Sequence, residues 1–123
     1  MEECIFCKRA QGDPDAEMTE VVFDNDRIKA FYDLYPKAPI HIIVIPKSHI
    51  ESIAHLSASG GEVDHHEIIS VLIYAAKDIA AKVGLKGYKL VFNVGKEGGQ
   101  IIDHLHLHIL GGWGEGTDRK IEI

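Results

Sequence analysis

The chain has 123 residues, of which 46% are hydrophobic and 26% charged, and its net charge is −6 with neutral histidines. This length supports one hydrophobic core, so we expect residues 1–123 to form a single domain. The excess of acidic residues argues against binding to nucleic acid, and the lack of a long apolar run or a secretory start argues against a membrane partner, so a cytoplasmic protein is expected.

The first half of the chain predicts a short turn followed by three strands. Residues 4–9 fit a single helical turn or a tight knuckle, and residues 11–17, polar with Gly and Pro, fit a loop. Strands are expected where apolar and β-branched residues run between turn residues, at residues 20–23, 28–32 and 40–45. Pro46 is expected to end the third strand.

The second half predicts one long helix and two more strands. Between residues 62 and 83 apolar side chains recur every three or four residues, which indicates an amphipathic helix that ends at Gly84. Strands are expected at residues 88–94 and 104–110, separated by a loop with glycines at residues 96–100. Several strands with one helix between the third and fourth predict an α+β fold with an antiparallel sheet.

The last predicted strand alternates histidine with leucine, in the order HLHLHIL. Side chains on a strand repeat their direction every second residue, so His104, His106 and His108 are expected on one face and the leucines on the other. A solvated polar face would explain the pattern, but so regular a spacing favours a functional site. A zinc site fits it. Nucleophilic catalysis also fits, with a neutral imidazole attacking phosphorus while a neighbouring imidazolium donates a proton.

Further segments narrow the choice between these two functions. HLHLHILGG, together with FYDLYPKAP (residues 31–39), HIIVIPKSHI (residues 41–50) and NVGKEGGQ (residues 93–100), resembles the histidine triad (HIT) superfamily from Cys4 to Gly112. The likeness is greatest to the Hint branch of nucleoside phosphoramidases. It implies a five-stranded antiparallel sheet with one long helix, a homodimer, and hydrolysis of the P–N bond of adenylyl or guanylyl amines, with no organic cofactor.

The resemblance also implies roles for individual residues. His106 would be the nucleophile that forms a nucleotidyl-histidine, His108 would hold a phosphate oxygen, and His104 would complete the triad. The nucleotide would contact Ile5, Phe6, Phe31, Asp33, Leu34, Asn93 and Gly99. Of these, Asp33 would bind the ribose and the apolar residues the base, with plain core packing as their alternative. Ile101 and Asp103 depart from the family pattern, since polar and aromatic residues are usual there, and Ile101 cannot protonate a leaving group.

Cys4 and Cys7 are the only cysteines and have the spacing of half a zinc site. The resemblance implies that His49 and His104 complete a structural zinc site with them. Two reduced thiols packed as small hydrophobes, or a redox pair, are the alternatives.

Three other features carry expectations of their own. His41 is expected to make a buried structural hydrogen bond, and His65 and His66 to be solvated at the start of the helix. Trp113 is expected either to reach the active site of a partner chain or to pack on its own sheet.

Two alternative functions remain beside phosphoramidate hydrolysis. The same histidine could serve a dinucleoside polyphosphate hydrolase or a nucleotidyltransferase. The chain could instead be a nucleotide-binding, zinc-stabilised interaction module with little turnover.

Overall fold

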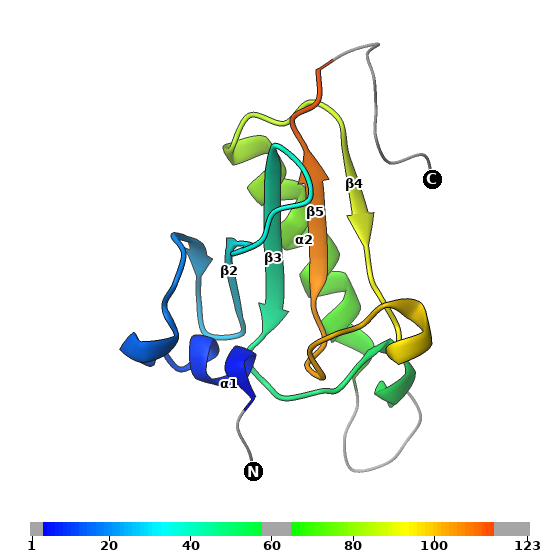
Figure 1. Cartoon of the computed structure of the whole chain (residues 1–123). Helices are drawn as coiled ribbons and strands as arrows, with labels where there is room; N and C mark the ends of the chain where they lie inside the picture. Colours follow the sequence, from blue (N-terminus) through cyan, green and yellow to red (C-terminus); the bar gives the residue numbers. More distant parts are fainter. Residues whose placement is uncertain (1–3, 58–64, 115–123) are drawn as a thin grey trace.

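The sheet has five antiparallel strands in the order β1-β2-β3-β5-β4 (Figure 1). The computed structural model describes residues 4–57 and 65–114. The strands are β1 Val21–Asp24, β2 Ile28–Tyr32, β3 Ile40–Pro46, β4 Tyr88–Val91 and β5 Leu107–Gly111. The α-helices of the described residues are α1 Ile5–Ala10 and α2 His66–Lys82, with short 3₁₀ turns at Pro14–Ala16, Ile53–His55 and Lys96–Gly98. The expected α+β fold, a five-stranded antiparallel sheet with one long helix, is confirmed.

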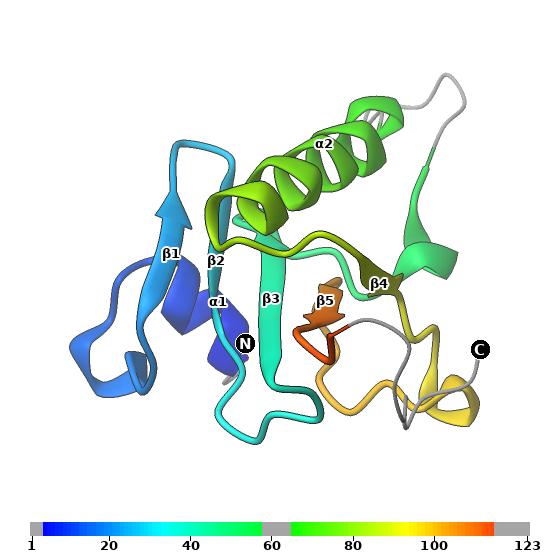
Figure 2. The same cartoon turned by 90° about the horizontal axis from the view of Figure 1, so that it is seen from above.

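Helix α2 covers one face of the sheet (Figure 2). Its apolar stripe, which includes Leu72, Ala76 and Ile79, packs in one buried cluster with alternate residues of the central strands. Leu105, Leu107 and Ile109 belong to this cluster, as their spacing predicted. No helix among residues 4–57 and 65–114 is long and apolar enough to cross a membrane.

Helix α1 packs through Phe6 and Ala10 in a second, smaller cluster with Phe31, Ile43 and Ile45. These strand residues alternate with those that face α2, so α1 and α2 lie against opposite faces of the sheet. Cys4 caps the helix, since its Sγ accepts a hydrogen bond from the Cys7 amide at 3.3 Å. The predicted N-terminal turn is therefore a helix that lies beside the end of β3 (Figure 1).

Several element boundaries differ from the predicted ones because pairing with a neighbour decides them. Strand β5 begins at Leu107, since the amides of His104 and Leu105 donate to the carbonyls of Ile102 and Ile50 instead of joining the ladder. Strand β4 ends at Val91, which pairs with His108, the second residue of β5. Pro46 ends β3 as predicted, but as its last residue, paired with Ile28 of β2. Helix α2 starts at His66, and residues 62–64 of the predicted helix lie outside the described residues.

Candidate active site and metal centre

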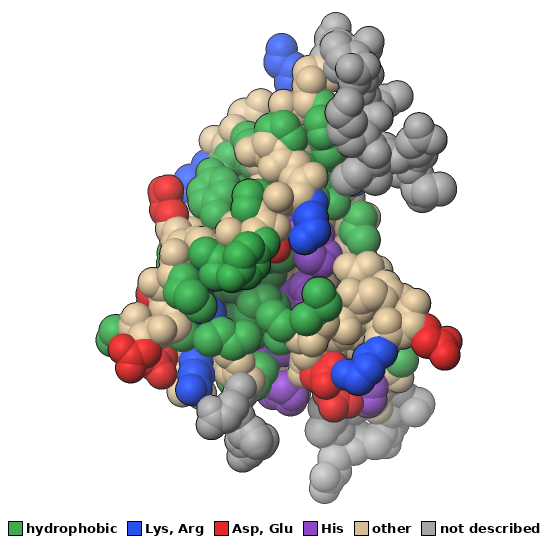
Figure 3. All heavy atoms as spheres, viewed as in Figure 1, with side chains coloured by type: hydrophobic (Ala, Val, Ile, Leu, Met, Phe, Trp, Pro, Cys, Tyr) green, Lys and Arg blue, Asp and Glu red, His purple; other side chains and the backbone are tan. Residues whose placement is uncertain are grey.

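The three triad histidines come together on the face of the sheet away from α2. Only His108 lies in β5, so the expectation that one strand carries all three is wrong. The rings of His106 and His108 are 5.0 Å apart, and Phe6 of α1 packs edge-on against His104 and His106 at 6.0 and 5.1 Å. Figure 3 shows histidine and apolar side chains adjoining on this face. His104 Nδ1 faces the sulfur atoms of Cys4 and Cys7, whereas His108 Nδ1 faces His41.

His106 presents one free ring nitrogen. Its Nδ1 lies 2.7 Å from the carbonyl oxygen of His104, and because a carbonyl only accepts, Nδ1 carries the proton. Burial lowers the pKa of His106 although the bond to the carbonyl raises it, so the ring is neutral near pH 7. Its Nε2 therefore holds a lone pair. A neutral imidazole with this tautomer is the form that attacks phosphorus.

His108 has the opposite tautomer, and His41 sets it. The backbone amide of Lys37 donates to Nδ1 of His41 at 3.0 Å, so the proton of a neutral His41 is on Nε2. This Nε2 lies 2.9 Å from Nδ1 of His108 and donates to it, which leaves the His108 proton on Nε2. The expected buried hydrogen bond of His41 is thus confirmed, and it orients a triad residue.

The donor at His108 is a neutral ring. Burial, with smaller contributions from His106 and His41, lowers the pKa of His108 to about 4, and burial also lowers the pKa of His41. At neutral pH His108 is therefore a neutral imidazole, whereas the sequence pattern also allowed an imidazolium. The Nε2–H of a neutral His108 is still a hydrogen-bond donor for a phosphate oxygen.

Cys4, Cys7, His49 and His104 bring four ligand atoms within 4.8 Å of one another. Cys7 Sγ lies 3.1 Å from His49 Nδ1 and 3.5 Å from His104 Nδ1, while Cys4 Sγ lies 3.3 Å from His104 Nδ1. The two Nδ1 atoms are 3.2 Å apart. A tetrahedral zinc ion with ordinary Zn–N and Zn–S bonds sets such ligand atoms roughly 3.4 to 3.8 Å apart. The spacing of these four ligand atoms therefore fits a zinc ion.

The tautomer of His104 agrees with this role. Its Nε2 lies 2.9 Å from the carbonyl oxygen of Pro46 and must donate to it, which leaves the lone pair on Nδ1, the atom that faces the cysteines. Burial lowers the pKa of His104 to about 4, so the ring is neutral. Burial, and then Cys4, raise the pKa of Cys7 to about 11, so a metal must displace a thiol proton to bind here.

Asp33, His41 and His108 form a second close group, within 4.8 Å of one another. Asp33 Oδ2 lies 3.4 Å from His41 Nε2. That nitrogen carries the proton donated to His108, so it has no lone pair for a metal ion. This group is a hydrogen-bonded network.

The residues expected around a base occupy different environments. Phe6 and Phe31 are buried and pack edge to face at 5.6 Å, whereas Ile5 is half-buried and Leu34 exposed. Asp33 is half-buried, accepts a hydrogen bond from the Tyr35 amide, and lies beside the triad through His41. Phe6 and Asp33 therefore lie beside the histidines, whereas Phe31 contacts Phe6.

The glycine-containing loop forms a compact turn. Asn93 Nδ2 donates to the Gly98 carbonyl at 2.9 Å, and Gly99 has a φ of +90°, which favours glycine. Gln100, only 4% exposed, hydrogen-bonds through its side chain to Gly95 in the loop, to Ile102, and to Glu51 in a distant segment. The sequence reasoning did not single out Gln100, because one polar residue after two glycines carries no periodic signal. Ile101 beside it is 87% exposed.

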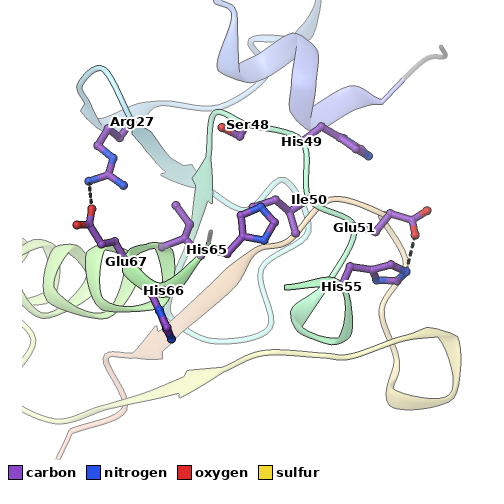
Figure 4. Close-up of a pocket in the computed structure, with 10 residues that line it drawn as sticks. Arg27, Ser48, His49, Ile50, Glu51, His55, His65, His66 and Glu67 are labelled. Carbon is purple, nitrogen blue, oxygen red and sulfur yellow. Dashed lines mark hydrogen bonds and ion pairs between the residues drawn. The ribbon is translucent and has the colours of Figure 1, made fainter. Parts of the chain in front are cut away.

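His49 also lines a separate cleft of about 970 Å³ (Figure 4). Neither His106 nor His108 lines this cleft. Four of its polar side chains form two pairs: His55 lies 2.9 Å from Glu51, and Arg27 lies 3.4 Å from Glu67. His66 is exposed as expected. His65 is half-buried, however, and its Nδ1 accepts a hydrogen bond from the Ser57 amide. Trp113, half-buried, follows β5.

Comparison with known proteins agrees with the fold and the histidine pattern. A family model described as the HIT domain matches residues 16–114. Protein HitA of Neisseria gonorrhoeae is 37% identical over 112 residues, which cover 90% of this chain and 97% of the relative.

Two solved structures are similar over nearly the whole chain. A HIT family hydrolase from Legionella pneumophila Philadelphia 1 has a TM-score of 0.80 and 42% identity, covering 93% of this chain and 100% of that one. A histidine triad protein from Clostridium difficile has a TM-score of 0.80 and 36% identity, covering 97% and 100%. The family match over residues 16–114, these likenesses and the triad at residues 104–108 lead to one conclusion: the chain belongs to the HIT domain family.

Proposed function

We propose that this chain is a nucleotide hydrolase of the Hint type, which cleaves nucleoside 5′-phosphoramidates through a nucleotidyl-histidine on His106. The observation that carries the proposal is the pair of opposite tautomers at the triad. His106 Nδ1–H is bound to the His104 carbonyl, so Nε2 is a nucleophile, and His41 leaves His108 with a donor on Nε2. A nucleophile beside a hydrogen-bond donor is what displacement at a phosphorus centre requires.

The reaction has two displacements. His106 Nε2 attacks phosphorus, the P–N bond to the amine breaks, and the amine takes up a proton as it leaves. Water then attacks the phosphorus, the bond to His106 breaks, and the nucleoside monophosphate is released with the neutral ring restored. Ile101 has no proton to give, and at 87% exposure it faces solvent, so water supplies the proton in this proposal.

The nucleotide, a purine nucleotide of the AMP or GMP type, is held by residues around the triad. Asp33 accepts hydrogen bonds from the ribose hydroxyls, and Ile5, Phe6, Phe31 and Leu34 provide the apolar side for the base. Asn93 and the backbone at Gly99 contact the phosphate, with His108. The support is the position of Phe6 against His106 and of Asp33 beside His41.

We further propose that Cys4, Cys7, His49 and His104 hold one structural zinc ion and that no organic cofactor takes part. A bound zinc ion would supply cross-linking, joining α1 to the segment that precedes β5. His104 serves both regions, because its side chain is a ligand while its carbonyl accepts the proton of His106.

A homodimer is proposed as the assembly. Strand β4 forms one edge of the five-stranded sheet, and on its inner side it pairs with β5. Exposed strand edges pair readily with another chain.

The test is amine release from a fluorogenic adenosine 5′-phosphoramidate by the wild type and by His106→Asn, with the exposed His66→Asn as the matched control. We expect turnover by the wild type and the control and near-complete loss in His106→Asn. Cleavage of a dinucleoside polyphosphate instead, or nucleotide binding without any turnover, would refute the phosphoramidase proposal. The first result would favour a polyphosphate hydrolase, and the second an interaction module.

A further inference from the structure

The buried side-chain amide of Gln100 bonds to the backbone before and after it in the chain and to the distant segment that carries Glu51. It is 4% exposed. Its Nε2 donates to the carbonyls of Glu51 at 2.6 Å and Ile102 at 2.9 Å, and its Oε1 accepts from the Gly95 amide at 2.9 Å. Both donors and the acceptor of the amide are therefore used.

One arm of this amide closes the loop proposed to contact the phosphate. The backbone N–H of Gly95 donates to Oε1 of Gln100. In return, the Gly95 carbonyl accepts a hydrogen bond from the backbone N–H of Gln100 at 3.0 Å. The Gly95 carbonyl also accepts from the Gly98 amide at 3.1 Å. The Gly98 carbonyl in turn accepts from Asn93. A chain of hydrogen bonds thus connects Gln100 to Asn93 through the turn.

The other arm reaches the segment that carries the triad. The Ile102 carbonyl accepts from Gln100 and, at 2.8 Å, from the His104 amide. Next to Glu51, the Ile50 carbonyl accepts from the Leu105 amide at 2.6 Å. Gln100 and Leu105 therefore bond to the carbonyls of two consecutive residues, Glu51 and Ile50.

The sheet does not perform this alignment. Strand β4 ends at Val91 and β5 begins at Leu107, so Asn93, the loop, His104 and His106 all lie outside the ladder. Their mutual position depends on the bonds that bridge the connection, and three of those belong to one buried side chain.

We propose that Gln100 is a positioning residue that fixes the loop at residues 93–99 relative to His106 and His108, so that the phosphate is held where His106 can attack. This inference rests on the proposed function. Gln100 itself touches no reacting atom. Its effect is on recognition of the phosphate and is separate from recognition of the base and ribose, because Phe6 and Asp33 are held by α1 and by the loop after β2.

The experiment compares binding of AMP and of adenosine, by calorimetry, to the wild type, Gln100→Met and Gln100→Glu. The matched control is Gln11→Met, at the other glutamine of the chain, which is exposed. Both Gln100 variants lose the two donors. Gln100→Glu keeps the size and the acceptor. We expect AMP binding to weaken roughly tenfold or more in both variants, as for loss of a hydrogen bond to a charged group. Adenosine binding and zinc content should be unchanged, and Gln11→Met should match the wild type.

The outcomes separate this inference from the proposed function. If the wild type binds AMP no more tightly than adenosine, the proposed phosphate site fails and this inference with it. If the wild type prefers AMP and the Gln100 variants keep that preference, only the inference is overturned. An equal loss of AMP and adenosine binding also overturns it, since that would show a general structural role.

A measurement on the wild type covers the case in which neither variant folds. The side-chain amide protons of Gln100 should shift in the NMR spectrum when AMP is added and stay in place with adenosine. Unchanged signals with bound AMP would overturn the inference.

Discussion

Replacing Glu17 by Gln should destabilise the protein strongly, although Glu17 lies in a loop. Its carboxylate is shared by two buried cations. Lys29 Nζ lies 2.6 Å from Oε2 and Arg9 Nε lies 3.4 Å from Oε1, and the side chains of Lys29 and Arg9 are only 4% and 5% exposed. Arg9 also covers the ring of Phe31 at 3.7 Å. The group ties α1 to β2.

The magnitude follows from the burial of the cations. Removing one partner of a buried ion pair costs about 3–5 kcal/mol, because the remaining charge has no compensation. Glu17 itself is 26% exposed, so water can reach part of the space. An amide oxygen also keeps one hydrogen bond. We therefore expect the lower end, about 3 kcal/mol, which is a fall in Tm of about 10 °C for a domain of this size.

Thermal and urea unfolding followed by circular dichroism would measure this loss, with the exposed Glu20→Gln as the control. Glu20→Gln should change the free energy of unfolding by less than about 0.5 kcal/mol. If Glu17→Gln were as stable as Glu20→Gln, the two cations would not depend on the carboxylate, and the reasoning from burial would be refuted.

Three further predictions concern the metal site and the effect of pH. The purified protein should carry one zinc ion per chain by mass spectrometry, and Cys7→Ser should lose it while His55→Ala keeps it; full occupancy in Cys7→Ser would contradict the assigned ligands. Because a thiol with a pKa of about 11 must lose its proton, zinc affinity should fall as pH falls. His108 has a pKa of about 4 in the folded state and 6.5 as its ordinary value, so the unfolded chain binds more protons between these values and stability is lost as pH falls through that window. Its share is up to about 1.4 kcal/mol per pH unit, measured as a smaller pH slope of urea unfolding in His108→Gln than in the wild type between pH 6.5 and 5.

Much of the fold could be predicted from local patterns in the sequence. The apolar stripe that includes Leu72, Ala76 and Ile79 predicted the helix, because a helix buries every third or fourth residue. The alternation through Leu105, Leu107 and Ile109 predicted which side of the last segment faces that helix. The spacing of Cys4 and Cys7 predicted half a zinc site, and the family resemblance named His49 and His104, whose ligand atoms the structure brings within 4.8 Å of those of the cysteines.

Other features depend on contacts between distant parts of the chain, which no local pattern records. The start of β5 at Leu107 is decided by the Ile50 and Ile102 carbonyls, and the tautomer of His108 by Lys37 through His41. The buried Glu17 group and the bonds of Gln100 likewise join segments far apart in sequence. The sequence by itself determined the order of the strands and the long helix, the family, and which histidines form the triad. Only the tertiary structure decided which ring nitrogen carries each proton, because that depends on the single acceptor or donor that folding places against it.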